Sequence, residues 1–219
     1  IHEKPVSFKG KHDPLRVIRK PKVVVDDSGK QTRATNKAAF ILGSALKKPH
    51  PYLAKKGFPE EKGWVWNDLL VIPMRINGDL VGCQLIDQEG NKKFLSGQKT
   101  KGASAIFDNK GTVLLCEGYA TALSIRRALK TIKHRYKIVV CFSAGNIVEM
   151  SKAYPDSLLV ADNDLMGIKV AKQIPRPYWI SPNKGEDFND FELRVGAEKA
   201  GVSLWNLIKS TSKQPASQT

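Results

Sequence analysis

Residues 157–164 read Ser-Leu-Leu-Val-Ala-Asp-Asn-Asp, an apolar run that ends in two carboxylates two positions apart. A short apolar run predicts a buried strand, and side chains two positions apart on an extended segment point the same way. Glu117 ends another apolar run earlier in the chain. Carboxylates at strand ends are an arrangement by which proteins hold Mg²⁺ against phosphates, so Asp162, Asp164 and Glu117 are the first candidates for a metal site.

The pattern around residues 157–164 predicts an α/β fold. From Gly111 onward, short apolar strands alternate with segments of helical periodicity. This alternation is typical of a Rossmann-like, mainly parallel sheet with helices on both faces. The expected strands are residues 113–116, 138–142, 157–161 and 178–180, and the expected helices are roughly 119–130, 146–153, 166–173, 188–195 and 197–208.

A different pattern precedes this domain. Asn77-Gly78 separates two strand-like runs and is a strong hairpin signal. With a third run at residues 92–95, these segments predict a small antiparallel meander. A helix at 34–48 and a helical turn at 52–57 precede it. The predicted organisation is a basic arm (1–33, with one short strand at 22–26), a smaller basic α+β subdomain (34–110), the α/β domain (111–208) and a polar tail (209–219).

The chain is strongly basic, with a formal net charge of +15 and an isoelectric point near 9.7. Its first 60 residues hold 14 Lys and Arg against 5 acids, so the positive charge lies mainly before the carboxylates described above. An excess of this size favours a polyanionic partner over a merely solvated surface.

Cysteine and hydropathy patterns exclude several classes of protein. The three cysteines, Cys83, Cys116 and Cys141, lie in apolar runs without zinc-ribbon spacing, which indicates buried free thiols in a reducing cytoplasm. No apolar run reaches the roughly 18 residues of a membrane span, and the polar, basic start does not resemble a signal peptide. The chain begins with Ile1, as expected of a processed chain or a piece of a longer polypeptide.

Several polar segments follow the predicted parallel strands. Ligands of open parallel sheets bind at the carboxyl ends of strands, where Glu117-Gly118, Ser143–Asn146 and the two aspartates fall. Gly118 and Gly145 are expected to allow tight turns and close backbone approach. A simpler interpretation exists for each acid alone, since Glu117 suits a helix N-terminus and Asp164 suits an N-cap. Together, in a cationic protein, they favour a metal site.

Asp187 follows the fourth predicted strand. It could add a carboxylate to the same edge, or it could cap the next helix with Asp190 in the first turn. The two interpretations are compatible and the sequence does not separate them.

These motifs resemble those of the Toprim domain found in bacterial-type primases, topoisomerases and some nucleases. The resemblance covers residues 34–208, and the tail motif is similar to that of plasmid and phage primases. It rests on Glu117-Gly118-Tyr119-Ala120-Thr121-Ala122, Ser143-Ala144-Gly145-Asn146, Asp162-Asn163-Asp164-Leu165-Met166-Gly167, Gly185-Glu186-Asp187-Phe188-Asn189-Asp190 and the basic meander with Lys92-Lys93-Phe94-Leu95-Ser96.

The resemblance implies the catalytic core of a DNA primase in a bacterial cell or phage-infected host. Such an enzyme joins ribonucleoside triphosphates into short RNA primers on single-stranded DNA by two-metal-type phosphoryl transfer. Asp162, Asp164 and Asp187 would bind Mg²⁺ or Mn²⁺, and Glu117 would share a metal or act as general base.

The resemblance also suggests nucleotide-contacting residues and partners. Nucleotide or template contacts would come from Arg75, Lys93, Lys99, Lys101, Gly118 and Gly145. Each basic residue could equally belong to a solvated loop. The partner would be a replicative helicase or a further domain of a longer chain, although no zinc-ribbon or helicase domain is visible within this length.

Two other hypotheses remain. One is a replication accessory protein that binds nucleic acid with a catalytically reduced Toprim domain. The other is a Toprim metal-dependent nuclease. The clustered acids disfavour the first, because such groups are costly without a cation. The upstream basic subdomain and the Gly185–Asp190 tail disfavour the second.

Overall fold

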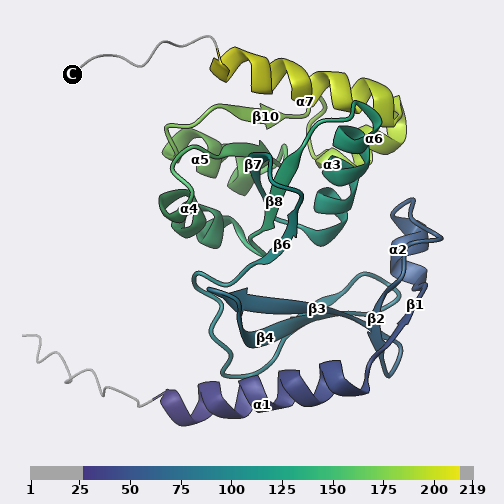
Figure 1. The fold of residues 1–219 in the computed structure, drawn as a ribbon, viewed down its shortest axis with the longest axis vertical. Helices are drawn as coiled ribbons and strands as arrows, with labels where there is room; N and C mark the ends of the chain where they lie inside the picture. Colours follow the sequence, from purple (N-terminus) through teal and green to yellow (C-terminus); the bar gives the residue numbers. More distant parts are fainter. Residues whose placement is uncertain (1–26, 213–219) are drawn as a thin grey trace, which may run out of the picture.

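Two five-stranded sheets organise the computed structural model, which describes residues 27–212 (Figure 1). The strand predicted at 22–26 lies outside the described residues, as do most of the predicted arm and the last residues of the predicted tail. One sheet is antiparallel and the other is mainly parallel. The α/β fold class predicted from the sequence is therefore confirmed.

The first sheet is an antiparallel meander. Its strands follow one another in space as in the sequence. The predicted hairpin is present, because Asn77 (φ 51°) and Gly78 (φ 93°) both adopt the left-handed conformation that a tight two-residue turn requires. The strands are β1 (Leu46–Lys48), β2 (Gly63–Trp66), β3 (Leu69–Ile76), β4 (Asp79–Ile86) and β5 (Lys92–Phe94).

Helix α1 (Ser28–Ser44) covers the face of this sheet that lies away from the second sheet (Figure 1). Its buried stripe of Ala34, Ala38 and Ile41 packs into one cluster with strand residues such as Cys83. The prediction placed this helix at 34–48, with residues 28–33 in the arm. The helix instead ends at Ser44, because residues 46–48 pair with β2 as a strand.

The second sheet has the order β10-β9-β7-β8-β6. The four predicted strands run parallel, and β6 adds an antiparallel edge that the sequence analysis did not predict. The predicted subdomain boundary at residue 110 therefore falls after a strand that already belongs to this sheet. The strands are β6 (Ala105–Asp108), β7 (Thr112–Cys116), β8 (Tyr136–Val140), β9 (Leu158–Ala161) and β10 (Tyr178–Ile180).

Helices cover both faces of the second sheet, as predicted. Residues of α3, α6 and α7 pack on one face, and residues of α4 and α5 pack on the other. Helix α7 continues to Ser212, four residues into the predicted polar tail. The bounds are α2 (Pro51–Lys55, before β2), α3 (Tyr119–Thr131), α4 (Ala144–Ala153), α5 (Leu165–Gln173), α6 (Phe188–Val195) and α7 (Ala197–Ser212).

The two sheets share a continuous core. Leu70 and Met74 of the first sheet belong to the same buried cluster as Leu114 of the second. The main chains of Arg75 and Ser104 exchange two hydrogen bonds of 2.9 Å. This junction fixes the first sheet against the domain that carries the candidate site.

Two predictions drawn from composition can be compared with the structure. Cys83, Cys116 and Cys141 are free and buried, as expected. Between residues 27 and 212, no helix combines the length and apolar character needed to cross a bilayer.

Candidate functional site

The four predicted acids gather where the parallel strands end. Glu117 follows β7, Asp162 follows β9, Asp164 caps α5, and Asp187 caps α6. The charges of Glu117, Asp164 and Asp187 all act on Asp162. The structure therefore places these carboxylates in one electrostatic cluster.

Main-chain hydrogen bonds hold the loops of this edge together. The N–H of Phe142 donates to the carbonyl of Glu117 at 2.9 Å. Asn163 is fixed from both sides, because its N–H donates to Glu186 O (3.2 Å) and its carbonyl accepts from Gly185 N–H (2.7 Å). The loop of Asp162 and Asp164 is thus fastened to the loop that leads into α6.

Two of the acids also cap helices, as the simpler interpretation expected. Asp164 Oδ1 accepts from Gly167 N–H at 2.7 Å, and Asp187 Oδ1 accepts from Asp190 N–H at 2.8 Å. Asp190 completes a capping box with Asp187. A cap occupies one carboxylate oxygen, so it leaves the other available to a cation.

Asp162 lies in an unusual environment. Its Oδ1 atom is buried and has no hydrogen-bond partner in the structure. Burial, followed by the negative charges of Asp187, Glu117 and Asp164, raises the pKa of Asp162 to about 7, whereas Lys92 acts in the opposite direction. Burial and Asp164 likewise raise the pKa of Glu117. A carboxylate with a buried, unpartnered oxygen among other acids is stabilised by a cation or by a proton.

The donor set fits a hard divalent cation bound partly through water. In residues 27–212, no three acidic, His or Cys side chains converge closely enough to enclose a metal by themselves. Mg²⁺ seldom needs such a cage, since it keeps several waters and binds through one or two carboxylates together with substrate phosphates. The orphaned Oδ1 of Asp162 provides one such ligand atom.

The two predicted glycines lie at this edge without the conformations expected of them. Gly118 is the N-cap of α3 in an extended conformation, and Gly145 lies in the first turn of α4. Neither has a positive φ, so neither turn requires glycine. A β-carbon on Gly145 would meet nothing within 4 Å. The tight turns predicted to require Gly118 and Gly145 are therefore absent, whereas the contact of these glycines with a nucleotide stays a prediction.

The four predicted basic residues are not brought together. Arg75 lines a groove of about 980 Å³ between the two sheets. Lys93 and Lys99 are exposed on the surface outside this groove, and Lys101 forms an ion pair with Glu149 (3.5 Å).

Two other lysines face the acids and were not predicted. Lys56 Nζ lies 4.0 Å from Asp187 Oδ2 and 3.7 Å from Asp190 Oδ1. Lys92 acts electrostatically on Asp162 and Glu117. Lys92 shares its side of β5 with Phe94, whose ring centroid lies 6.4 Å from that of Phe142 beside the site, so this choice of side follows from the tertiary structure. No local signal marks Lys56.

Comparisons with known proteins give distant structural matches. No model of a known protein family matches the chain. The fold is similar to the structure of the DnaG catalytic core (TM-score 0.46, 10% identity) and to a DNA primase domain from Pseudomonas aeruginosa (TM-score 0.44, 14% identity). Each match covers 80% of this chain. The chain spans 63% of the first structure and 58% of the second, less than two thirds of either.

Proposed function

We propose that this chain is the catalytic part of a primase-type nucleotidyltransferase with a Toprim-like α/β domain. It would synthesise short RNA primers on single-stranded DNA from ribonucleoside triphosphates, with Mg²⁺ or Mn²⁺. The observation that carries the proposal is the buried, unpartnered carboxylate oxygen of Asp162 among three further acids at the end of a parallel sheet. Phosphoryl transfer depends on a site of this kind, where charge is neutralised and groups are positioned.

Asp162, Asp164 and Asp187 would hold the cation. When bound, the ion would neutralise charge on the phosphates of the incoming nucleotide. Glu117 would accept the proton of the attacking 3′-hydroxyl or share the ion. Its raised pKa makes it a better proton acceptor than an exposed glutamate. Lys92 acts electrostatically on Glu117 and Asp162, and it would add positive charge beside the phosphates.

The groove between the sheets suits a single nucleic-acid strand. Its lining combines cations such as Lys62 and Arg75 with the rings of Trp64 and Phe107. Single-strand binding sites combine positive charge along the backbone with aromatic rings on which bases stack. Tyr119 also lines this groove and lies two residues after Glu117, so the groove reaches toward the acids.

The test is primer synthesis. The protein is incubated with single-stranded DNA, labelled ribonucleotides and Mg²⁺ or Mn²⁺, and the products are separated by length. Wild type should make short oligoribonucleotides, whereas Glu117→Gln and Asp162→Asn should not. Asp156→Asn is the matched control, because Asp156 is exposed at the opposite end of β9.

Other outcomes would favour the other hypotheses. Metal-dependent shortening of the DNA without synthesis would point to a nuclease, which uses the same ions on an existing phosphodiester. Salt-sensitive binding with neither reaction would point to an accessory protein. Synthesis that survives both substitutions would refute the assignment of the site.

A further inference from the structure

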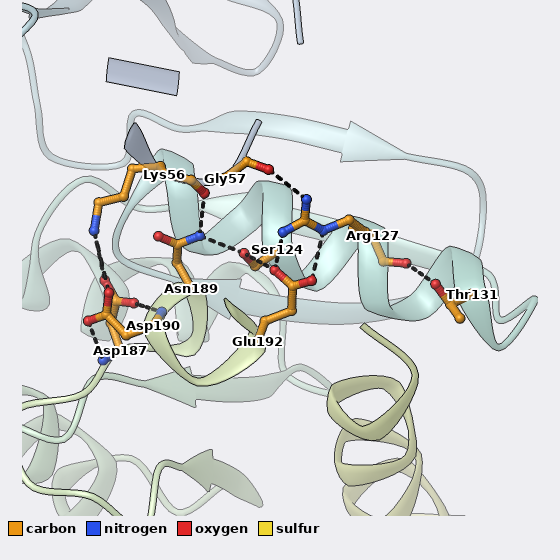
Figure 2. A network of polar contacts seen from close by, with 9 residues as sticks. All are labelled: Lys56, Gly57, Ser124, Arg127, Thr131, Asp187, Asn189, Asp190 and Glu192. Carbon is orange, nitrogen blue, oxygen red and sulfur yellow. Dashed lines mark hydrogen bonds and ion pairs between the residues drawn. The ribbon is translucent and has the colours of Figure 1, made fainter. Parts of the chain in front are cut away.

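A network of buried and half-buried polar contacts extends from Arg127 to the start of α6 at Asp187, and it joins the α/β domain to the turn at Lys56 and Gly57 (Figure 2). Its centre is Glu192 on α6, which is 3% exposed. Arg127 on α3 donates two hydrogen bonds to this carboxylate, one of them from Nε to Oε1 at 2.7 Å. Ser124, also on α3 and fully buried, donates to Glu192 Oε2 at 3.1 Å.

The same side chains hold the turn that follows α2. Arg127 Nη1 donates to the carbonyl of Gly57 at 2.8 Å. Asn189 on α6 is fully buried, and its Nδ2 donates to the carbonyl of Lys56 and to Ser124 Oγ, both at 2.9 Å. The guanidinium of Arg127 also covers the ring of Phe58, 4.1 Å from its centroid. Two helices of the α/β domain therefore fasten one turn of the preceding subdomain.

Gly57 makes this close docking possible. Its φ of +82° is a left-handed conformation that favours glycine. A β-carbon at this position would stand 2.4 Å from Cδ2 of Leu193, so that exposed side chain of α6 would have to move. The turn therefore requires glycine mainly for its backbone conformation.

This docking determines what faces Asp187. Asn189 and Glu192 lie two and five residues after Asp187, the N-cap of the same short helix. Fixing them fixes the start of α6, because a helix is stiff over so few residues. The docked turn also brings Lys56 Nζ to 4.0 Å from Asp187 Oδ2.

We propose that Arg127, Glu192 and Asn189 are positioning residues for cation binding: they dock the Lys56–Gly57 turn on α6, and they thereby hold Asp187 beside Asp162 with Lys56 as its counter-ion. The inference rests on the proposed function for the metal role of the acids. Lys56 and the metal compete for Asp187. Glu192 favours metal binding without contacting the metal, because it helps to position Asp187.

The test titrates Mn²⁺ alone against the full chain and follows the free ion by electron paramagnetic resonance. Glu192→Gln should weaken Mn²⁺ binding about tenfold, as substitutions behind metal ligands commonly do. In a chain that already carries Asp187→Asn, Glu192→Gln should have little further effect, because both act through the same carboxylate. Lys56→Met should strengthen Mn²⁺ binding, since it removes the competing charge.

A matched control distinguishes positioning from general loosening. Glu61 and Arg126 form another ion pair between α3 and the segment after the turn, at 2.5 Å, without contacting α6. Glu61→Gln should leave Mn²⁺ affinity unchanged. Thermal unfolding of each variant shows whether it is folded, and Lys56→Met, on the surface, provides the decisive measurement if Glu192→Gln does not fold.

Three results would overturn the inference. The first is unchanged Mn²⁺ affinity in every folded variant among Glu192→Gln and Lys56→Met while Asp162→Asn weakens binding, which leaves the proposed function standing. The second is full additivity of Glu192→Gln with Asp187→Asn. The third is no Mn²⁺ binding by wild type, which would overturn the proposed metal site as well.

Discussion

Gly167 lies so close to Asp162 that a β-carbon on Gly167 would stand 2.1 Å from the main-chain carbonyl oxygen of Asp162. The N–H of Gly167 also donates to Asp164 Oδ1 at 2.7 Å. The glycine of the Asp162–Gly167 motif therefore lets the first turn of α5 pack directly against the strand end that carries the acids.

Replacement of this glycine should disturb the site. Gly167→Ala forces the backbone of α5 or of Asp162 to shift, and such overpacking costs roughly 1–3 kcal/mol. Urea unfolding measures the cost, and Mn²⁺ affinity should fall in parallel. Gly43→Ala is the control, since Gly43 lies in a helix and nothing stands within 4 Å of its added carbon. That control should be neutral or stabilising by up to about 1 kcal/mol. Equal behaviour of the two variants would contradict the close packing.

The acid cluster predicts a dependence of stability on pH. The pKa of Asp162 is raised from its usual 3.8 to about 7, so the folded chain binds a proton there that the unfolded chain loses at lower pH. The contribution of protonated Asp162 to stability is complete below pH 3.8 and is lost as pH rises through 7. Without metal, Asp162→Asn should flatten this decline, as thermal unfolding in EDTA would show.

Mg²⁺ should reverse the loss at higher pH, because metal binds the deprotonated carboxylate. The midpoint of thermal unfolding should therefore rise on addition of Mg²⁺ at about pH 8 in wild type and in Asp156→Asn, but little in Asp162→Asn. A pH dependence that is identical in wild type and Asp162→Asn would refute the raised pKa.

The ion pair between half-buried Arg127 and buried Glu192 should matter more than surface charges. Arg127→Ala leaves the buried carboxylate of Glu192 without its charged partner, a change that costs up to about 3–5 kcal/mol where the pair is fully buried. Arg33 is an exposed arginine on α1, and Arg33→Ala should stay within about 0.5 kcal/mol of wild type. Urea unfolding of both variants tests the difference, and a small loss for Arg127→Ala would show that water reaches Glu192.

The position of a bound single strand can be tested by salt dependence. If DNA occupies the groove, Lys62→Gln should weaken binding and lower the slope of log K against log salt by about 1. Trp64→Ala should cost about 1–3 kcal/mol of binding through lost stacking. Lys99→Gln is the comparison, because Lys99 lies outside the groove. Fluorescence anisotropy measures the DNA affinity of all three variants. A loss of affinity confined to Lys99→Gln would place the DNA strand at Lys99, outside the groove.

Much of the fold could be predicted because its signals are local. Asn77-Gly78 specifies a tight hairpin by the left-handed conformation of two adjacent residues. Strands β7 to β10 are short apolar runs, each followed by a helix. Asp164 and Asp187 are caps whose hydrogen-bond partners lie three residues further along the chain. Interactions between residues only a few positions apart can be recognised as patterns in the sequence.

Strands β1, β2 and β6 were not predicted, and each is only three or four residues long. Residues 46–48 read Leu-Lys-Lys and are all exposed, and they become β1 only by pairing with β2. Strand β6 becomes the edge of the second sheet through its pairing with β8, which lies beyond β7 and α3 in the chain. Such short segments carry too few residues for alternation to identify them.

The sequence by itself determined the local elements and the strand-end positions of Glu117, Asp162 and Asp164, since both follow from contacts between near neighbours along the chain. Only the tertiary structure decided that Lys92 acts on Asp162 and Glu117 and that Lys56 pairs with Asp187. The bond from Asn189 to the carbonyl of Lys56 spans 133 residues. No pattern within one element encodes a contact of that separation, because it depends on how two subdomains pack.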